Sequence, residues 1–278
     1  MSLRRGRFIA SLAVLAVAGL VVAAAGAAAT VPPKYKHGLK IAADATYAPN
    51  EFIASNGHTV VGMDADLAKA IGKVLHVKVT VVNATFDSII PGLQSGKYDL
   101  GMSSFTDTKA REKVVDFVTY FSAGTSFYGK KGGPTVGTLG ALCGHTVGVE
   151  KGTTQQDDAT AQNAKCKKTG KSSVKVSVFP DQNGVNLALS SGRVQVAMAD
   201  SPVAAYQVKQ SRGQFRLMGK PYGTAPYGIA VPKKSGLAKP ILSAVKTLMK
   251  NGTYTKILKK WGIQEGAIHS PKINAAVS

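Results

Sequence analysis

The sequence predicts an α/β fold made of two similar lobes. Strand-like and helix-like segments alternate along the chain, which is typical of a parallel sheet covered by helices. In addition, the segment Leu93–Met102 is echoed by Leu189–Met198, with Leu, Ser, Gly and Met at matching offsets. Each copy reads as a helix end, a glycine stop, a basic residue and a short buried strand. We therefore expect the same helix–strand unit in each lobe.

Local patterns define the first series of elements. Residues 39–43 form an apolar strand, and a helix begins near Asp64, where acidic residues complement the helix dipole and apolar residues recur at helical spacing. The segment 77–82 alternates and is rich in β-branched residues, which predicts a strand. The next helix runs from Phe86 to a stop at Gly96.

A second series follows a break near Pro134. Its expected strands are 146–149, 174–179 and 194–199, and its expected helices begin after Gly152, near Val185 and at Ser201. A last strand at 227–231 and two helices at 237–250 and 253–261 complete the pattern. Because two helices are too few to form a domain, we expect them to return to the first lobe. The predicted organisation is lobe 1 at 38–124 plus 224–263, lobe 2 at 128–220, and an irregular tail at 264–278.

The N-terminal segment 1–29 has the pattern of a secretory signal peptide. Three arginines precede an apolar stretch at 8–22, and Ala27-Ala28-Ala29 offers a cleavage site. The alternative is a retained membrane anchor, because the apolar stretch approaches spanning length. We expect the protein to be exported to the periplasm or to the outer face of the cell membrane.

The chain is strongly basic, with a formal net charge of +20 at pH 7. The positive charge is spread over many single sites, and the only dense run is Lys165-Cys166-Lys167-Lys168. Because the chain has no arginine-rich arm or basic strip interleaved with aromatics, we do not expect a nucleic-acid partner. A solvated face attracted to an anionic cell envelope accounts for the charge.

Cys143 and Cys166 are the two cysteines of the chain. In an exported protein, two cysteines favour one disulfide. A metal site is the alternative, because His145 lies close to Cys143. No second pair of ligands with suitable spacing accompanies them, so we expect no metal.

Different polar residues follow the two copies of the repeated segment. The first copy leads into Ser103-Ser104-Phe105-Thr106 and then Arg111, whereas the second leads into Asp200-Ser201. One lobe thus supplies hydroxyls and a cation, and the other supplies an anion. Opposite charges facing each other across a cleft suit a free amino acid. Because motifs for nucleotide or serine-hydrolase chemistry are absent, we expect neither a cofactor nor catalytic residues.

Several motifs make the chain similar to a known family. They are Asp44-Ala45-Thr46-Tyr47-Ala48-Pro49, Val61-Gly62-Met63-Asp64-Ala65-Asp66-Leu67, Phe86-Asp87-Ser88-Ile89-Ile90-Pro91-Gly92-Leu93, Thr106-Asp107-Thr108-Lys109-Ala110-Arg111, Val147-Gly148-Val149-Glu150-Lys151-Gly152-Thr153-Thr154, Ala199-Asp200-Ser201, Asn251-Gly252-Thr253-Tyr254 and Lys259-Lys260-Trp261. In this order, across residues 38–263, the chain resembles the extracellular solute-binding proteins of polar amino acid ABC transporters (family 3), which include glutamine- and lysine/arginine/ornithine-binding proteins. One departure is Pro49-Asn50-Glu51-Phe52, because the family often has Phe directly after this Pro.

The resemblance implies a two-lobed periplasmic-binding-protein (type II) fold with two crossover segments. It also implies a monomer that is not an enzyme. Such a protein binds a polar or basic L-amino acid between closing lobes and delivers it to the permease of an ABC importer. Two alternatives remain open on the same scaffold: an enzyme resembling periplasmic dehydratases, and a ligand-sensing module for another receptor.

The resemblance assigns Arg111 to the ligand's α-carboxylate. A guanidinium suits this role because it donates two parallel N–H bonds and stays charged. A surface salt bridge with Glu112 or Asp116 is the alternative. Hydroxyls and amides of the nearby segment would complete the carboxylate's hydrogen bonds, from Ser103, Ser104 and Thr106.

The second lobe is expected to hold both ends of the ligand's backbone. Thr153 and Thr154 open a helix whose N-terminal amides favour an anion, although capping alone would explain them. Asp200 would accept hydrogen bonds from the α-ammonium, and it also suits the N-cap of its own helix.

Four residues are expected to surround the ligand's side chain. Tyr47 and Phe86 would form walls, with a role in the core as the alternative for Phe86. Asp44 and Glu51 lie nearest the expected specificity pocket. Acidic groups there would suit a cationic side chain, or an amide that donates.

Overall fold

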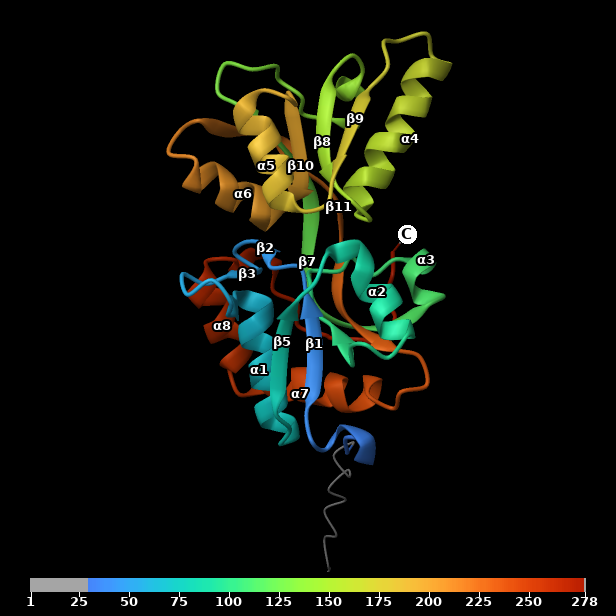
Figure 1. Ribbon diagram of the computed structural model, residues 1–278, viewed down its shortest axis with the longest axis vertical. Coiled ribbons are helices and arrows are strands. Elements are labelled where there is room, and N and C mark those ends of the chain that lie inside the picture. The colour runs from blue at the N-terminus through green and yellow to red at the C-terminus, as the bar shows by residue number, and fades with distance from the viewer. Residues whose placement is uncertain (1–29, 278) are drawn as a thin grey trace, which may run out of the picture.

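The computed structural model describes residues 30–277, so the predicted signal peptide at 1–29 lies outside the described residues. Figure 1 shows two groups of elements stacked along the long axis. We call residues 39–112 together with helices α7 (Ala238–Lys250) and α8 (Thr253–Trp261) the first lobe, and residues 146–210 the second lobe. Within 30–277, no helix has the length and apolar character needed to cross a bilayer.

The two lobes share one sheet with the strand order β5-β1-β6-β11-β7-β10-β8-β9. Its strands are β1 (Leu39–Ala43), β5 (Val79–Asn83), β6 (Leu100–Gly101), β7 (Val115–Lys130), β8 (Thr146–Glu150), β9 (Lys175–Phe179), β10 (Val196–Asp200) and β11 (Phe215–Pro232). Within each lobe the short strands pair in parallel, as β1 does with β5 and β6, and β8 with β9 and β10. The long strands β7 and β11 pair antiparallel and connect the lobes. The predicted α/β fold with two crossover segments is confirmed.

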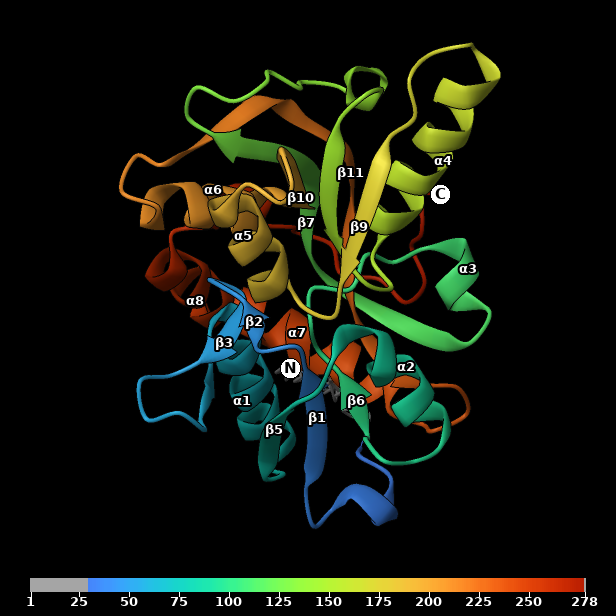
Figure 2. The same ribbon diagram turned by 45° about the horizontal axis from the view of Figure 1, so that its top comes forward.

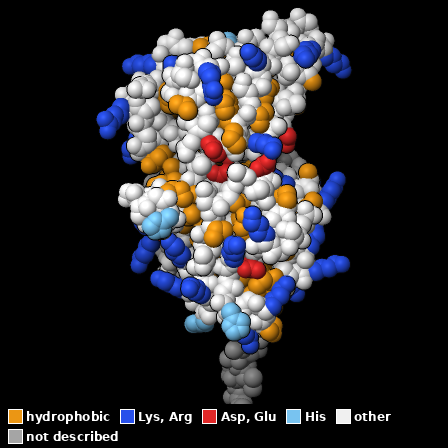
Figure 3. Space-filling view, in the orientation of Figure 1, with side chains coloured by type: hydrophobic (Ala, Val, Ile, Leu, Met, Phe, Trp, Pro, Cys, Tyr) orange, Lys and Arg blue, Asp and Glu red, His pale blue; other side chains and the backbone are white. Residues whose placement is uncertain are grey.

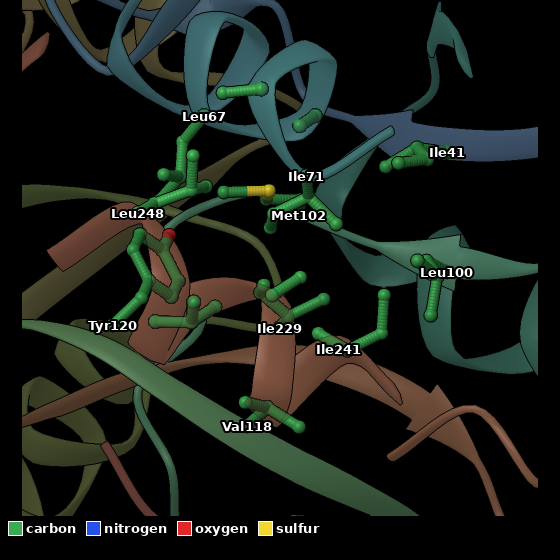
Figure 4. Close-up of a cluster of buried hydrophobic side chains, with 14 of the residues drawn as sticks. Ile41, Leu67, Ile71, Leu100, Met102, Val118, Tyr120, Ile229, Ile241 and Leu248 are labelled. Atoms are coloured by element: carbon green, nitrogen blue, oxygen red, sulfur yellow. The ribbon is translucent and has the colours of Figure 1, made fainter. Parts of the chain in front are cut away.

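The helices cover both faces of the sheet in each lobe. The remaining ones are α1 (Met63–Leu75), α2 (Phe86–Gln94), α3 (Lys109–Glu112), α4 (Thr154–Lys168), α5 (Gln182–Ser191) and α6 (Ser201–Gln210). In the first lobe, Leu67 and Ile71 of α1 pack with Leu248 of α7 over Ile41 and Ile229 of the sheet (Figure 4). Burying this many apolar side chains is the main source of the lobe's stability.

In the second lobe, successive residues of a strand pack against helices on opposite faces of the sheet. Phe127 and Met198 belong to the cluster that packs against α4, whereas their neighbours Tyr128 and Ala197 pack against α5 on the other face. Figure 2 shows α4 and α5 on opposite sides of β8 and β9. Successive side chains of a strand point to opposite faces, so both faces of this sheet are buried.

Two features differ from the sequence prediction. A small sheet of β2 (Thr46–Tyr47), β3 (Glu51–Ile53) and β4 (Val60–Val61) was not predicted, because two or three residues carry no detectable period. The expected strand at 227–231 is only the end of β11, whose earlier part contains Gly219, Pro221 and Gly223. The pairing with β7 accommodates these residues through register shifts on either side of Tyr222.

The C-terminal tail has little regular structure, as expected, but it docks along β7. The amide of Asn274 donates to the carbonyl oxygen of Phe117 at 2.9 Å. Further along, the amide of Ala275 donates to Asp107 Oδ2 at 2.7 Å, and that of Ala276 donates to Glu112 Oε1 at 3.0 Å. The tail therefore holds the segment that carries α3.

The predicted disulfide between Cys143 and Cys166 is present and attaches α4 to the turn before β8. Because the two cysteines are 23 residues apart, the chain-entropy model gives the bond about 3 kcal/mol. We expect the double substitution Cys143→Ser, Cys166→Ser to lower the free energy of unfolding by about that amount, measured by urea denaturation. Dithiothreitol should destabilise the wild-type protein to the same extent and leave the variant unchanged. An equal effect of reductant on both proteins would contradict this account.

Candidate functional site

A cavity lies between the two lobes. It forms where the carboxyl ends of β1, β8 and β10 converge, the usual place for a ligand in open α/β sheets. All eleven predicted ligand-binding residues line this cavity: Asp44, Tyr47, Glu51, Phe86, Ser103, Ser104, Thr106, Arg111, Thr153, Thr154 and Asp200. Two further lining residues, Glu150 and Gln155, were not predicted. The structure brings these residues together, and their roles toward a ligand stay predictions.

The two lobes touch each other around this cavity. Lys151 of the second lobe forms an ion pair with Asp87 of the first, at 2.7 Å between Nζ and Oδ2. The amide of Asp200 donates to the hydroxyl oxygen of Tyr47 at 2.9 Å, so the rim is joined by polar contacts. On the face shown in Figure 3, acidic side chains gather where the lobes meet, whereas lysines and arginines are spread over both. The structure is therefore a closed form.

Arg111 is held with its guanidinium at the cavity. Its Nη1 donates to the carbonyl oxygen of Thr106 at 2.8 Å, and Nη2 donates to that of Gly152, in the second lobe, at 3.0 Å. The guanidinium carbon lies 5.3 Å from the centre of the Phe86 ring and 5.6 Å from that of Phe105. The proposed alternative of a surface salt bridge with Glu112 or Asp116 is wrong. Since a guanidinium has five donors, three remain for a carboxylate.

Asp200 faces Arg111 from the end of β10. Its Oδ1 accepts from Gln155 Nε2 at 2.7 Å, and its Oδ2 accepts from the Tyr227 hydroxyl at 2.6 Å. Although Asp200 occupies the N-cap position of α6, its side chain makes no capping hydrogen bond. The capping role considered for this carboxylate is therefore absent, and the carboxylate is directed to the cavity. Burial raises its pKa, while the hydrogen bond from Tyr227 opposes that shift.

The hydroxyl groups of Ser103 and Ser104 contact the buried Glu51 and are not free to bind a ligand. Ser103 Oγ donates to Glu51 Oε1 at 2.9 Å, and Ser104 Oγ lies 3.3 Å from Glu51 Oε2. Below them, Asp64 Oδ2 accepts from the amide of Ser104 at 2.8 Å. Burial raises the pKa of Glu51 well above its usual range, and it raises that of Asp64 to about 6. The charge of the neighbouring Asp64 further disfavours the ionised form of Glu51.

Asn50 explains the departure from the family's usual Pro-Phe sequence. Its side chain is fully buried, and Nδ2 donates to Ser104 Oγ at 2.8 Å. A phenylalanine at this position would leave the serine and the acids beneath it without that donor. The substitution therefore belongs with the buried polar network around Glu51.

Asp44 lies at the N-terminus of α2. Its Oδ2 accepts from the amide of Phe86 at 2.9 Å, and its Oδ1 accepts from the Thr46 hydroxyl at 2.6 Å. Burial nevertheless raises the pKa of Asp44. Phe86 stacks on Phe105 at 4.5 Å between ring centres while also lining the cavity, so its wall and core positions coexist.

The two threonines of the second lobe differ in what their hydroxyls do. Thr153 caps α4 by accepting from the amide of Gln156 at 3.2 Å, and its hydroxyl donates to the carbonyl oxygen of Glu150 at 2.7 Å. The capping alternative is thus confirmed for Thr153. The Thr154 hydroxyl has only a 3.5 Å contact with Gln155, so it can contribute to a ligand.

Sequence reasoning missed Glu150 and Gln155. Glu150 is the last residue of β8, as Asp200 is of β10, so its position at a strand end was the available signal. Gln155 lies one residue beyond the predicted threonines, and Nε2 donates to both Asp200 and Thr125. Within the described residues, no group of three or more His, Cys, Asp or Glu side chains is arranged to hold a metal ion.

Comparisons with known proteins identify the family. The profile of the bacterial extracellular solute-binding proteins, family 3, matches residues 39–264. An arginine-binding protein of Corynebacterium glutamicum is 31% identical over 237 residues, which cover 85% of this chain and 78% of that protein.

Solved structures agree with this match. An ancestral arginine-binding protein bound to arginine is 40% identical with a TM-score of 0.75, covering 80% of this chain and 97% of that one. An ancestral arginine-binding protein bound to glutamine is 39% identical with a TM-score of 0.75, covering 81% and 97%. An ancestral amino acid-binding protein described as a precursor of cyclohexadienyl dehydratase is 34% identical with a TM-score of 0.73, covering 82% and 96%. The predicted two-lobed binding-protein fold is confirmed, and the chain belongs to the family 3 bacterial extracellular solute-binding proteins.

Proposed function

We propose that the protein binds a polar or basic L-amino acid between its lobes and delivers it to the permease of an ABC importer. The observation that carries this proposal is the pairing of Arg111 with Asp200 across one closed cavity. A zwitterion satisfies both groups at once, because its carboxylate suits the guanidinium and its ammonium suits the carboxylate.

The remaining charge of the cavity favours a basic side chain. The cavity holds Asp44, Glu150 and Asp200 against one lining base, Arg111, while the raised pKa of Glu51 favours the neutral form of that acid. A guanidinium or ammonium group near Asp44 would offset this excess. The arginine-binding relatives support the same ligand class.

Closing of the lobes is how the ligand would be retained. The α-carboxylate would contact Arg111 of the first lobe and the N-terminus of α4 in the second, and the α-ammonium would contact Asp200 of the second lobe. Only the closed form makes all of these contacts. We propose that the protein works as an exported monomer in the periplasm or at the outer face of the cell membrane. We also propose that it acts without a nucleic-acid partner.

Isothermal titration of the purified protein against the twenty amino acids tests the proposal. We expect arginine or lysine to bind most tightly. If none of the twenty binds at pH 7, the proposal is wrong. Competition between ligands, followed by intrinsic fluorescence, would confirm that they share one cavity.

We propose that the protein is not an enzyme, although one structural relative is described as a dehydratase precursor. In this protein the carboxyl groups of the cavity already accept hydrogen bonds from the protein: Glu51 from Ser103, and Asp44 from Thr46 and Phe86. Incubation with a cyclohexadienyl acid should give no product by absorbance, whereas turnover would favour the enzyme alternative.

A further inference from the structure

Glu150 is an acid of the cavity to which the proposed function assigns no contact with the ligand. It ends β8 in the second lobe, and only 2% of its surface is exposed. Its Oε1 atom has no hydrogen-bond partner among the described residues, although the side chain lines the cavity. A buried oxygen without a partner is costly, so this atom marks a place where a donor belongs.

Acidic groups surround Glu150. Asp44 of the first lobe lies within hydrogen-bonding reach of its carboxyl group, while Asp181 and Asp200 lie within its own lobe. The phenol groups of Tyr47 and Tyr128 also lie close enough to interact with it. No positive charge is among these neighbours. Burial raises the pKa of Glu150 well above its usual range, and the charge of Asp44 raises it further.

Neither Arg111 nor Lys151 is assigned to Glu150, because the free donors of Arg111 serve the ligand's α-carboxylate in the proposed function. Arg111 donates to carbonyl oxygens of Thr106 and Gly152, and Lys151 pairs with Asp87 at 2.7 Å. Two carboxylates that share a dry site cannot both be ionised unless a positive charge joins them. In the closed form, Asp44 and Glu150 therefore need either a proton or a cation between them.

The pair is assembled only by closing, because Asp44 belongs to the first lobe and Glu150 to the second. When the lobes separate, water reaches both carboxyl groups and each ionises near its ordinary pKa. Closing then has to supply one positive charge. A ligand with a guanidinium or ammonium side chain brings that charge with it, whereas a neutral side chain does not.

We propose that Glu150 makes the selection between cationic and neutral amino acids depend on pH. Closing over a cationic side chain needs no proton, and closing over a neutral side chain takes up one proton, shared by Glu150 and Asp44. This inference rests on the proposed amino acid binding and adds to it a second side-chain selector, contributed by the opposite lobe.

The affinities for neutral and cationic ligands are expected to depend differently on pH. With a neutral ligand, the closed complex holds one proton more than the open protein, so its affinity falls as pH rises, by at most about tenfold per pH unit. With a cationic ligand, the proton count does not change and the affinity stays level. Glu51 and Asp64 titrate as well, and Glu51 lines the same cavity, so the part of the slope that belongs to Glu150 is the part that its substitution removes.

The test compares L-arginine with L-citrulline, which has nearly the same shape and no side-chain charge. Isothermal titration at pH 5, 6, 7 and 8 should show citrulline weakening by at least about 30-fold across the range, while arginine changes by less than about threefold. At pH 7, titrations in phosphate and in Tris buffer should show proton uptake with citrulline and none with arginine.

Glu150→Gln keeps the size of the side chain and removes its charge. This variant should make citrulline binding independent of pH and weaken arginine binding by about tenfold or more. Glu265→Gln, which removes an exposed acid, is the matched control and should behave like the wild type.

Three results would overturn the inference. They are equal pH slopes for both ligands, an unchanged citrulline slope in Glu150→Gln, and no citrulline binding even at pH 5. Failure of the proposed function looks different, because then no amino acid binds at any pH.

Discussion

Replacing Arg111 with alanine is expected to weaken the binding of every amino acid ligand by about two to three orders of magnitude. The ligand's α-carboxylate would be left in a closed cavity without its charged partner, and removing one member of a buried charge pair costs about 2–5 kcal/mol. Isothermal titration with the tightest ligand of the panel measures this loss. Arg111→Lys keeps the charge but loses the planar fork, so we expect an intermediate affinity.

Arg193 provides the matched control for this substitution. Its guanidinium also lies over a phenyl ring, 5.4 Å from the centre of Phe179, but its side chain is exposed and does not line the cavity. Arg193→Ala should therefore bind ligand as the wild type does. Wild-type affinity in Arg111→Ala would show that the carboxylate is bound elsewhere.

Replacing Phe105 with alanine is expected to damage stability and binding together. The ring is buried, stacks on Phe86 at 4.5 Å and lies beneath the guanidinium of Arg111. Removing a buried phenylalanine typically costs about 3–5 kcal/mol. Urea denaturation without ligand should show this loss, and titration should show at least about tenfold weaker binding, because Arg111 loses the surface on which it rests.

Phe127→Ala is the control that separates the loss of stability from the loss of binding. It is also fully buried and stacked, here on Tyr222 at 5.3 Å, but it belongs to the core of the second lobe and not to the cavity wall. Phe127→Ala should lower stability by a similar amount and leave the affinity nearly unchanged. If Phe105→Ala lost stability alone, the aromatic stack would have no part in positioning Arg111.

The helices and parallel strands could be predicted because each has a local pattern. Leu39–Ala43 is apolar except for the exposed Lys40, and α1 carries apolar residues at helical spacing, so both elements are recognisable without their neighbours. The crossing strands are different. β11 contains Gly219, Pro221 and Gly223, which oppose strand formation locally, and its pairing with β7 is what holds it extended.

The residues of the candidate site also differ in whether a local pattern or a distant neighbour reveals their role. Asp200 could be predicted because it ends a recognisable strand, and Arg111 because the family motif Thr106–Arg111 assigned it to a carboxylate. Glu150 also ends a strand, but its significance depends on Asp44, which approaches from the other lobe. Since sequence shows neighbours along the chain and not across a cleft, the acidic pair could not be anticipated.

The docked tail affects when the site can form during synthesis. Asp107 and Glu112 flank Arg111, and their carboxylates accept hydrogen bonds from amides of Ala275 and Ala276, more than 160 residues later in the chain. A growing chain that has reached only the end of β7 has Arg111 but lacks the segment that holds its loop. The loop that carries Arg111 therefore gains these two hydrogen bonds only after the last residues of the chain have been made.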